Sequence, residues 1–386
     1  MNKEMKVVYA FEEAPESYAK SLFLAGPTPR DEKTLSWRSG ALRLLESAGY
    51  NGVVFIPEAK NGAWRDDYDG QIEWEDKHLN MADCILFWVP RDLVSMPAFT
   101  TNVEWGTWHK SGKCVLGAPP DATKMSYFLH YAKKLGIPSS DSLAGVIKLA
   151  LAMLGDGSPR NGGEREVPLR IWRTEYFQSW YQSQKNAGNR LDGARVVCTF
   201  SFDQKKDVLF FWTLQTNIFV KNENRNKTNE IVVARPDISS VLLYRRGKTL
   251  RETEVVLVRE FRSPAATSDG NVRELPGGSA SKPGMSDGEN AVEELREETG
   301  FTMDPSRLKM HASRQLAATL SLHKAHLFSA EITAEELAWF KTQKDVVHGD
   351  NELSERTYVE VRTVKELLGS GDLDWTTIGM ALSVLR

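Results

Sequence analysis

The chain has 386 residues, 41% of them hydrophobic, and its 49 Lys and Arg against 52 Asp and Glu leave a formal net charge of −3. This length exceeds what one hydrophobic core usually serves, so we expect two domains. The balanced charge argues against the basic field of a nucleic-acid-binding domain, and no apolar run approaches the ~20 residues of a membrane helix. We therefore expect a soluble, cytoplasmic protein that acts on a small molecule, with neither nucleic acid nor a membrane as partner.

Short apolar runs alternate with helical patterns through the first third of the chain. The runs SLFLAG, GVVFIP, CILFWVP and KCVLG are typical of buried strands, and WRSGALRLLESAGY, QIEWEDKHLNMAD and NVEWGTWHKSG lie between them as helices. This rhythm predicts an α/β fold with a doubly wound, flavodoxin-like parallel sheet. Such sheets bind ligands beyond the carboxyl ends of their strands, which places Gly26 and Pro27 at the mouth of a site.

A composition change marks the expected domain boundary. The segment 155–168, GDGSPRNGGEREVP, replaces hydrophobic periodicity with Gly, Pro and charge, so we expect a linker between domains at 1–154 and 169–386. In the second domain, LRIWRTEYFQSWYQSQKNAG predicts an aromatic-rich helix packed on that domain. The runs VVCTFSF, VLFFWTLQ, SSVLLYRR and EVVLVREF predict strands, and an acidic helix follows them.

The first domain carries carboxylates where an α/β sheet would place chemistry. Glu104 follows the loop SMPAFTT and is expected in the first turn of a helix, where the helix dipole favours an ionised carboxylate. An ionised carboxylate at the mouth of a sheet can attack the anomeric carbon of a nucleoside and hold the sugar as an ester while the base departs. Glu73, Glu75 and Asp76 are candidates for the acid that protonates the base, and spacing does not choose among them.

The order of the runs SLFLAGPTPR, WRSGALRLL, QIEWEDKHLNMADCILFWVP and MPAFTTNVEWGTWHKSGKCVLGAP, over roughly Ser21 to Tyr131, resembles nucleoside 2-deoxyribosyltransferase-like proteins. In that family the glutamate of a T-x-x-E-x-G motif accepts the sugar, and Thr101, Glu104 and Gly106 occupy these places here. The resemblance implies that Glu104 is the nucleophile, with Glu75 or Asp76 where the family has one aspartate. Thr101 would join Gly26 and Pro27 in binding substrate. Relatives often share sites between subunits, which leaves a homo-oligomer open.

The second domain contains an acidic helix. Glu294, Glu297 and Glu298 recur at spacings of three and four, so their carboxylates share one face. Like charges at such close range are tolerable when a hard divalent cation, Mg²⁺ or Mn²⁺, lies between the oxygens. The alternative is a solvated surface helix.

Gly277, Gly278, Gly300 and the run EELREETG together resemble the second half of the Nudix box. The resemblance implies an alpha-beta-alpha sandwich over roughly Ala194 to Arg386, in which the three glutamates bind metal and water attacks a nucleoside diphosphate-linked substrate such as ADP-ribose. The ADP-ribose branch of the family further implies the following residues: Arg259, Arg262 and Glu274 to bind substrate, and Glu352 or Glu355 to activate water.

Two positions depart from the box. Glu293 stands where an arginine is usual, and Met285 where a glutamate is usual. The leading hypothesis is a bifunctional nucleotide-processing enzyme that breaks or transfers an N-glycosidic bond in its first half and hydrolyses a phosphoanhydride with Mg²⁺ in its second. The alternative is a nucleotide-sensing or nucleotide-binding protein whose altered box binds a diphosphate without cutting it.

Overall fold

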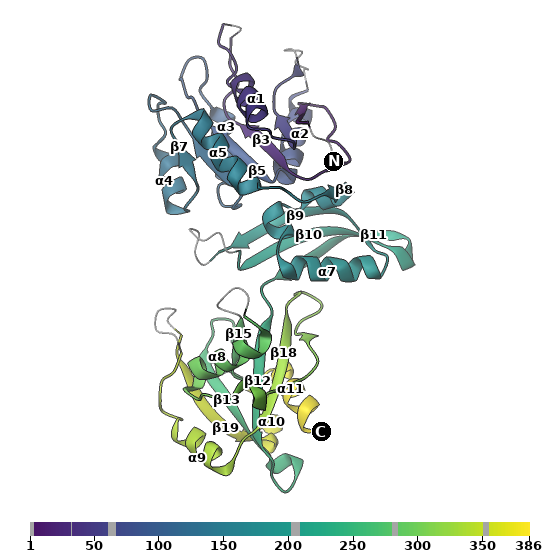
Figure 1. Ribbon diagram of the computed structural model, residues 1–386, viewed down its shortest axis with the longest axis vertical. Helices are drawn as coiled ribbons and strands as arrows, with labels where there is room; N and C mark the ends of the chain where they lie inside the picture. Colours follow the sequence, from purple (N-terminus) through teal and green to yellow (C-terminus); the bar gives the residue numbers. More distant parts are fainter. Residues whose placement is uncertain (1–3, 32, 61–66, 202–208, 280–284, 350–354) are drawn as a thin grey trace. The chain divides into compact units, whose positions relative to one another are not determined.

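The computed structural model describes residues 4–31, 33–60, 67–201, 209–279, 285–349 and 355–386. The chain divides into unit 1, Met1–Ala234, and unit 2, Arg235–Arg386 (Figure 1). All three cysteines are free, and Cys84 and Cys114 are buried in strands, as the sequence predicts. Among the described residues, no helix has both the length and the apolar character needed to cross a membrane.

A parallel sheet forms the centre of the first part of unit 1. Its six described strands lie in the order β1-β4-β3-β5-β6-β7. Their bounds are β1 Lys6–Tyr9, β3 Ser21–Ala25, β4 Val53–Ile56, β5 Cys84–Trp88, β6 Cys114–Gly117 and β7 Ser139–Ser140. The four predicted strands are confirmed. The sequence analysis missed β1, whose four residues KVVY are too few to show a pattern among charged neighbours.

Helices cover both faces of this sheet (Figure 1). Helices α1 (Arg38–Ser47) and α5 (Leu143–Leu154) pack on one face, and α2 (Tyr68–Met81), α3 (Phe99–Trp108) and α4 (Ser126–Lys134) on the other. Alternate strand residues enter the two cores: Phe23 faces α2 and α3, whereas Leu24 faces α1 and α5, and both are fully buried. This burial on two faces explains why the strands are almost continuously apolar.

Residues 155–234 also belong to unit 1. They form β8 (Arg160–Asn161), which pairs with β2 (Ser17–Tyr18), then the 3₁₀ helix η2 (Gly162–Glu166), α6 (Leu169–Trp172) and α7 (Glu175–Asn186). A three-stranded antiparallel sheet follows, with β9 (Arg190–Phe200), β10 (Phe211–Val220), which η3 (Lys221–Glu223) connects to the next strand, and β11 (Arg225–Ala234). The predicted aromatic helix is present as α7, but it packs on β10 of unit 1: the rings of Tyr176 and Trp212 stack with centroids 5.9 Å apart.

The segment predicted as a linker is anchored to the parallel sheet. Arg160 is fully buried and contacts both carboxylate oxygens of Asp83, at 2.7 and 2.5 Å. The backbone N–H of Leu169 donates to the same carboxylate. The structure therefore divides the chain after Ala234 and not at 155–168. Composition hid this because a buried ion pair resembles loop charge in a sequence.

Unit 2 is a mixed sheet between two helical layers (Figure 1). Its described strands are β12 (Ile238–Arg245), β13 (Glu254–Phe261), β14 (Asn271–Glu274), β15 (Gly277–Ser279), β16 (Lys309–Met310), β17 (Arg314–Gln315), β18 (Lys324–Glu331) and β19 (Thr357–Thr363), with 3₁₀ helices η4 (Leu250–Glu252) and η5 (Pro305–Arg307). Helices α8 (Asp287–Thr299) and α9 (Ala334–Thr342) pack on one face, and α10 (Val364–Gly369) and α11 (Trp375–Leu385) on the other. Assignment to the Nudix fold stays a prediction.

Candidate functional site

A pocket of about 900 Å³ opens at the carboxyl end of the parallel sheet. In the sheet, β3 lies between β4 and β5. The chain runs from β3 to its neighbour β4 and then returns past β3 to β5, so the strand order reverses between β3 and β5. Ligands bind α/β sheets at such switch points. The pocket is lined by the loop after β3, the start of α3 and one side of α2.

Gly26 and Pro27 both line the pocket, where the sequence predicts them. Gly26 has a φ of +152°, and a Cβ there would lie 2.1 Å from the carbonyl oxygen of Trp88. Only glycine tolerates this approach. The carbonyl oxygen of Pro27 accepts a hydrogen bond from Trp37 Nε1 at 3.1 Å. The loop after β3 is thereby packed on the end of β5, which fixes one wall of the pocket.

Glu104 lines the pocket from α3 and is half-buried. The sequence predicted it in the first helical turn, but α3 begins earlier, at Phe99, because Ala98 before it adopts a left-handed conformation with φ 60°. Burial and, to a smaller extent, the nearby Glu75 carboxylate raise the pKa of Glu104 to about 8, while Arg38 opposes the rise. This rise runs against the ionised carboxylate that a place in the first helical turn predicts.

Glu75 is the second carboxylate that acts on Glu104. It is half-buried on α2, its Oε1 accepts a hydrogen bond from Gln71 Nε2 at 2.8 Å, and both residues line the pocket. Burial raises the pKa of Glu75, while the Gln71 amide and Arg38 oppose the rise. Asp76 lines the pocket but is exposed, and Glu73 is exposed and outside the lining. Helical spacing left these three acids equivalent, and the fold distinguishes Glu75.

Thr101 lies in the core. It is fully buried and is not among the pocket-lining residues, and its hydroxyl oxygen has no hydrogen-bond partner among the described residues. The structure therefore does not bring it together with Gly26, Pro27 and Glu104. Thr101 is three residues before Glu104, which suggests that both side chains lie on one face of α3. The residues of α3 that line the pocket include Glu104 but not Thr101.

Arg38, at the start of α1, is a pocket residue that the sequence analysis missed. Its side chain is 2% exposed, yet it lines the pocket. Its guanidinium and Nε donate to Leu24 O (3.0 Å), Gly26 O (2.6 Å), Pro27 O (3.4 Å), Thr28 Oγ1 (3.2 Å) and Glu58 Oε1 (2.6 Å). An arginine on an amphipathic helix usually faces solvent, so only its place in the run WRSGALRLL could have indicated this burial.

Fold and pocket together define this part of unit 1 as a small-molecule-binding α/β domain with paired carboxylates. Residues 19–122 match the family model described as nucleoside 2-deoxyribosyltransferase like, and they form a nucleoside 2-deoxyribosyltransferase-like domain. The match includes both Glu75 and Glu104. It suggests an enzyme of the transferase or glycosylase type with a nucleoside as its small-molecule partner. No curated protein matches the chain significantly.

In unit 2, two of the three predicted metal-binding glutamates converge on the glycine pair before α8. Glu298 is 3% exposed, and its Oε2 accepts the backbone N–H of Gly277 at 2.8 Å. A Cβ on Gly278 would lie 2.5 Å from Glu294 Oε2, so the Glu294 carboxyl group lies directly against this glycine. Burial, with a smaller contribution from neighbouring carboxylates, raises the pKa of Glu294 to about 7. Burial also raises the pKa of Glu298 well above its usual value.

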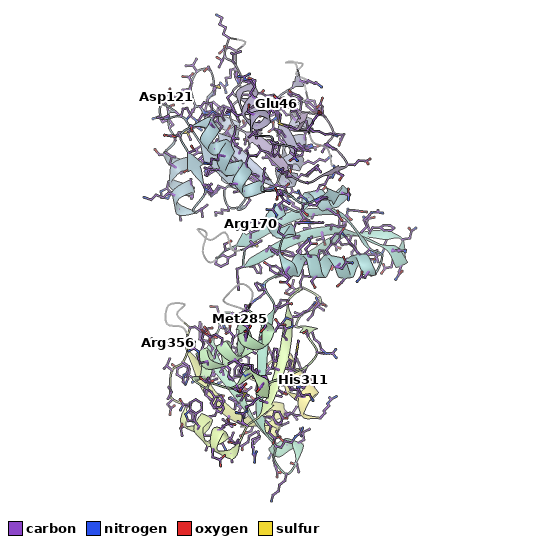
Figure 2. The ribbon with its side chains drawn as sticks, in the orientation of Figure 1. Glu46, Asp121, Arg170, Met285, His311 and Arg356 are labelled. Carbon is purple, nitrogen blue, oxygen red and sulfur yellow. The ribbon has the colours of Figure 1, made fainter. Side chains whose placement is uncertain are left out.

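Glu297 lies close to Glu294, because among the neighbouring carboxylates it raises the pKa of Glu294 most. It is half-buried, and its Oε1 is 3.5 Å from the Arg296 guanidinium, which also pairs with Glu293 at 3.0 Å. Met285, labelled in Figure 2, directly precedes the N-cap of α8. Within the described ranges, no group of three His, Cys, Asp or Glu side chains is placed to hold a metal ion. Glu352 lies outside the described residues.

The predicted substrate-binding residues of unit 2 separate into two groups. Arg262 pairs with Glu260 at 2.7 Å and Glu355 at 3.4 Å, and it opposes the burial that raises the pKa of Glu274. Glu274 in turn raises the pKa of Glu298, so Arg262 and Glu274 belong with the glutamates.

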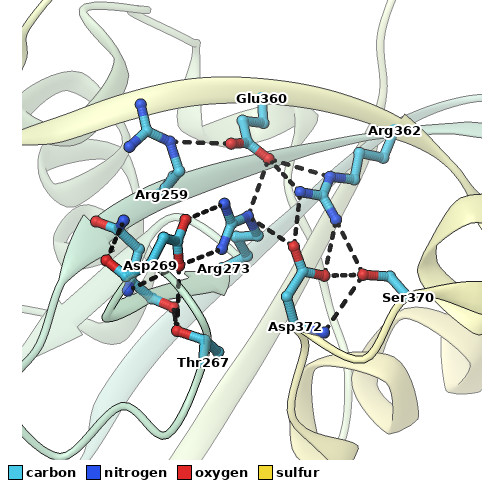
Figure 3. A network of polar contacts seen from close by, with 9 residues as sticks. Arg259, Thr267, Asp269, Arg273, Glu360, Arg362, Ser370 and Asp372 are labelled. Carbon is cyan, nitrogen blue, oxygen red and sulfur yellow. Dashed lines mark hydrogen bonds and ion pairs between the residues drawn. The ribbon is translucent and has the colours of Figure 1, made fainter.

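Arg259 instead joins the network of Figure 3, where its Nε is 3.0 Å from Glu360 Oε1. Arg273 and Arg362 bind the same glutamate and also Asp372. This network ties β13, β14 and β19 to the loop after α10. Arg259 is thus placed in this ion-pair network, and its role in binding substrate stays a prediction.

Proposed function

We propose that unit 1 cleaves the N-glycosidic bond of a nucleoside or nucleotide through Glu104, and passes the sugar to another base or to water. The observation that carries the proposal is that Glu104 and Glu75 line one pocket at the switch point of a nucleoside 2-deoxyribosyltransferase-like domain, where the Glu75 carboxylate raises the pKa of Glu104.

In the proposed reaction the Glu104 carboxylate attacks the anomeric carbon, the bond from carbon to base nitrogen breaks, and its electrons leave with the base. Glu75, as a carboxylic acid, gives its proton to that nitrogen. The sugar remains as an ester of Glu104 until an acceptor base or water attacks the same carbon. The ester then leaves as the Glu104 carboxylate.

The chemistry requires a proton on Glu75 and none on Glu104. Burial raises both pKa values, and the Glu75 carboxylate adds to the rise at Glu104, so we propose that the two carboxyl groups share protons as a coupled pair. The developing positive charge on the sugar lies against Glu104 and favours its ionised form, which transfers the shared proton to Glu75. The pocket therefore assembles the reactive protonation state when the substrate approaches its transition state.

A mass-spectrometric screen of nucleosides and nucleotides tests this assignment, with the wild type compared to Glu104→Ala and Glu75→Gln. The matched control is Glu73→Gln, since Glu73 lies on the same helix as Glu75 but is exposed and outside the pocket. Free base or an exchanged nucleoside should form with the wild type and the control and disappear with Glu104→Ala. Equal product from Glu104→Ala and wild type would sink the assignment.

For unit 2, the convergence of Glu294 and Glu298 on Gly277 and Gly278 favours a second function. We propose that it hydrolyses a nucleoside diphosphate-linked substrate of the ADP-ribose type. Mg²⁺ is bound in proteins by as few as one or two carboxylates, with water and substrate phosphates as its other ligands. Glu294 and Glu298, which both have raised pKa values and repel each other as carboxylates, fit such a cation. When bound, it would neutralise phosphate charge, while Arg262 is near enough to contact the substrate.

Glu298→Gln in the presence of Mg²⁺ or Mn²⁺ tests this second function, with Glu293→Gln as the control on the same helix. A metal-dependent phosphate product that is lost in Glu298→Gln alone supports hydrolysis. Calorimetry distinguishes the alternative: a nucleotide sensor binds ADP-ribose and returns it unchanged. Glu293 and Met285, which depart from the Nudix box, favour that alternative.

A further inference from the structure

Two carboxylates in one pocket pose a problem of charge. The charged residues that line it are Arg30, Arg38, Glu75, Asp76 and Glu104, and Glu58 lies behind Arg38 as its ion-pair partner. Arg30 is exposed at the rim and lies over the ring of Phe99 at 5.2 Å. When Glu104 ionises, its negative charge must therefore be balanced in the interior, where water is scarce and charge interactions are strong.

Arg38 meets that requirement by its position. It is 2% exposed, and four of its five acceptors belong to the end of β3 and the loop that follows it, Leu24 to Thr28. A planar guanidinium with this many fixed acceptors holds a single orientation. The cation is thus immobilised at the pocket wall that contains Gly26, whereas an exposed lysine or arginine would move with solvent.

We propose that Arg38 is a positioning residue for the glycosidic reaction: it holds the loop after β3 at the pocket and supplies the positive charge against which Glu104 ionises. The proposal rests on the proposed role of Glu104. The proposal also assigns a role to Glu58. Because Glu58 pairs with the Arg38 guanidinium, it weakens the electrostatic attraction between Arg38 and ionised Glu104.

The electrostatic direction agrees with this geometry. Arg38 lowers the pKa of Glu104 and also that of Glu75, against the burial that raises both. Glu58 is 17% exposed and contacts Arg38 at 2.6 Å without lining the pocket. Removing the charge of Arg38 or of Glu58 should therefore move the titration of Glu104 in opposite directions, which a merely structural role would not produce.

The test titrates Glu104 directly in the full chain labelled with ¹³C at the glutamate carboxyl carbons, with its signal assigned by its loss in Glu104→Gln. Arg38→Gln should raise the pKa of Glu104 by about one unit, and Glu58→Gln should lower it. Arg38→Lys keeps the positive charge but loses the several hydrogen bonds of the guanidinium. The pKa of Glu104 should therefore stay near that of the wild type, while kcat should fall because the loop after β3 is displaced. Below the pKa, the kcat of Arg38→Gln should fall about tenfold with little change in KM.

Arg160→Gln is the matched control, because Arg160, on β8, is an equally buried arginine that pairs with Asp83 outside the pocket. It should lower thermal stability without moving the titration of Glu104. An unchanged Glu104 titration in both Arg38→Gln and Glu58→Gln overturns the inference. If Arg38→Gln does not fold, Glu58→Gln alone decides the question, because it should lower the pKa of Glu104. If the wild type releases no base from any substrate, the proposed function fails, while the titration still decides the role of Arg38.

Discussion

The two carboxylate sites differ in how the chain brings their members together. Glu294 and Glu298 are one turn apart on α8, so their spacing alone placed them on one face. Glu75 and Glu104 lie on different helices, α2 and α3, and meet because the parallel sheet orients both helices toward the same mouth. A motif on one helix can be found by counting residues, whereas a pair across two helices requires the fold.

The sites also differ in how their charge is balanced. In unit 1 a buried guanidinium, that of Arg38, opposes the raised pKa of both carboxyl groups. In unit 2 the side chains that act most on Glu298 are the carboxylates of Glu274 and Glu294, and each raises its pKa. In unit 2, Arg262 opposes the raised pKa of Glu274 and Arg235 that of Glu294, whereas in unit 1 one guanidinium acts on both carboxyl groups.

The largest expected effect separates the two activities. Glu104→Gln should lower base release by at least about a thousandfold, because it removes the nucleophile, and should leave any metal-dependent phosphate product unchanged. Glu298→Gln should do the reverse. Both products are measured in the same mass-spectrometric assay with Mg²⁺ present. A loss of both products in either single variant would mean that the sites do not act independently.

A smaller effect concerns the stability of unit 2. A raised folded-state pKa favours folding below the usual glutamate pKa, and this stability is lost as the pH rises through the folded-state value. Glu298 is such a group, so Glu298→Gln should stabilise unit 2 at pH 8.5 by about 1–3 kcal/mol and much less at pH 5. Calorimetry at the two pH values measures this. Mg²⁺ should stabilise the wild type and not the variant; equal stabilisation of both would contradict a metal role for Glu298.

The pH dependence of base release tests the unit 1 pair. Glu104 must be ionised to attack. The value of kcat/KM, which reports on the free enzyme, should therefore rise with pH, and the midpoint of the rise should lie near the Glu104 pKa of about 8. Glu75→Gln removes a neighbouring negative charge and should lower that midpoint by about one unit. A substrate with a good leaving group is used, so that loss of the Glu75 proton does not mask the shift. A midpoint that stays in place would show that Glu75 does not act on Glu104.

Sequence patterns predicted the features that repeat locally. The apolar runs located β3, β4, β5 and β6, and the glycines at 26, 277 and 278 marked real close approaches of the backbone. What they missed depends on contacts between distant segments. Arg38 and Arg160 are charged residues that become buried because carbonyls and carboxylates far along the chain surround them.

Helix boundaries were the other source of error. The sequence predicts that a helix begins after SMPAFTT. In the structure, Ala98 is in the left-handed conformation and α3 already starts at Phe99, so Glu104 lies beyond the first turn. Non-glycine residues rarely adopt this conformation, so the sequence gives little indication of it. That shift changed the expected charge of Glu104, because the dipole effect is confined to the first turn while burial acts along the whole pocket-facing side.

The smallest expected effect comes from Thr101, the motif residue that the structure places in the core. Its hydroxyl oxygen is buried without a described partner, so Thr101→Val replaces an unsatisfied polar group with an apolar one of similar shape. The variant should be unchanged in kcat/KM and equal to or more stable than the wild type, by at most about 1 kcal/mol in denaturant unfolding. A large loss of kcat/KM with intact stability would instead place Thr101 at the substrate. It would mean that α3 rotates when the substrate binds, so that unit 1 completes its site only with a ligand present.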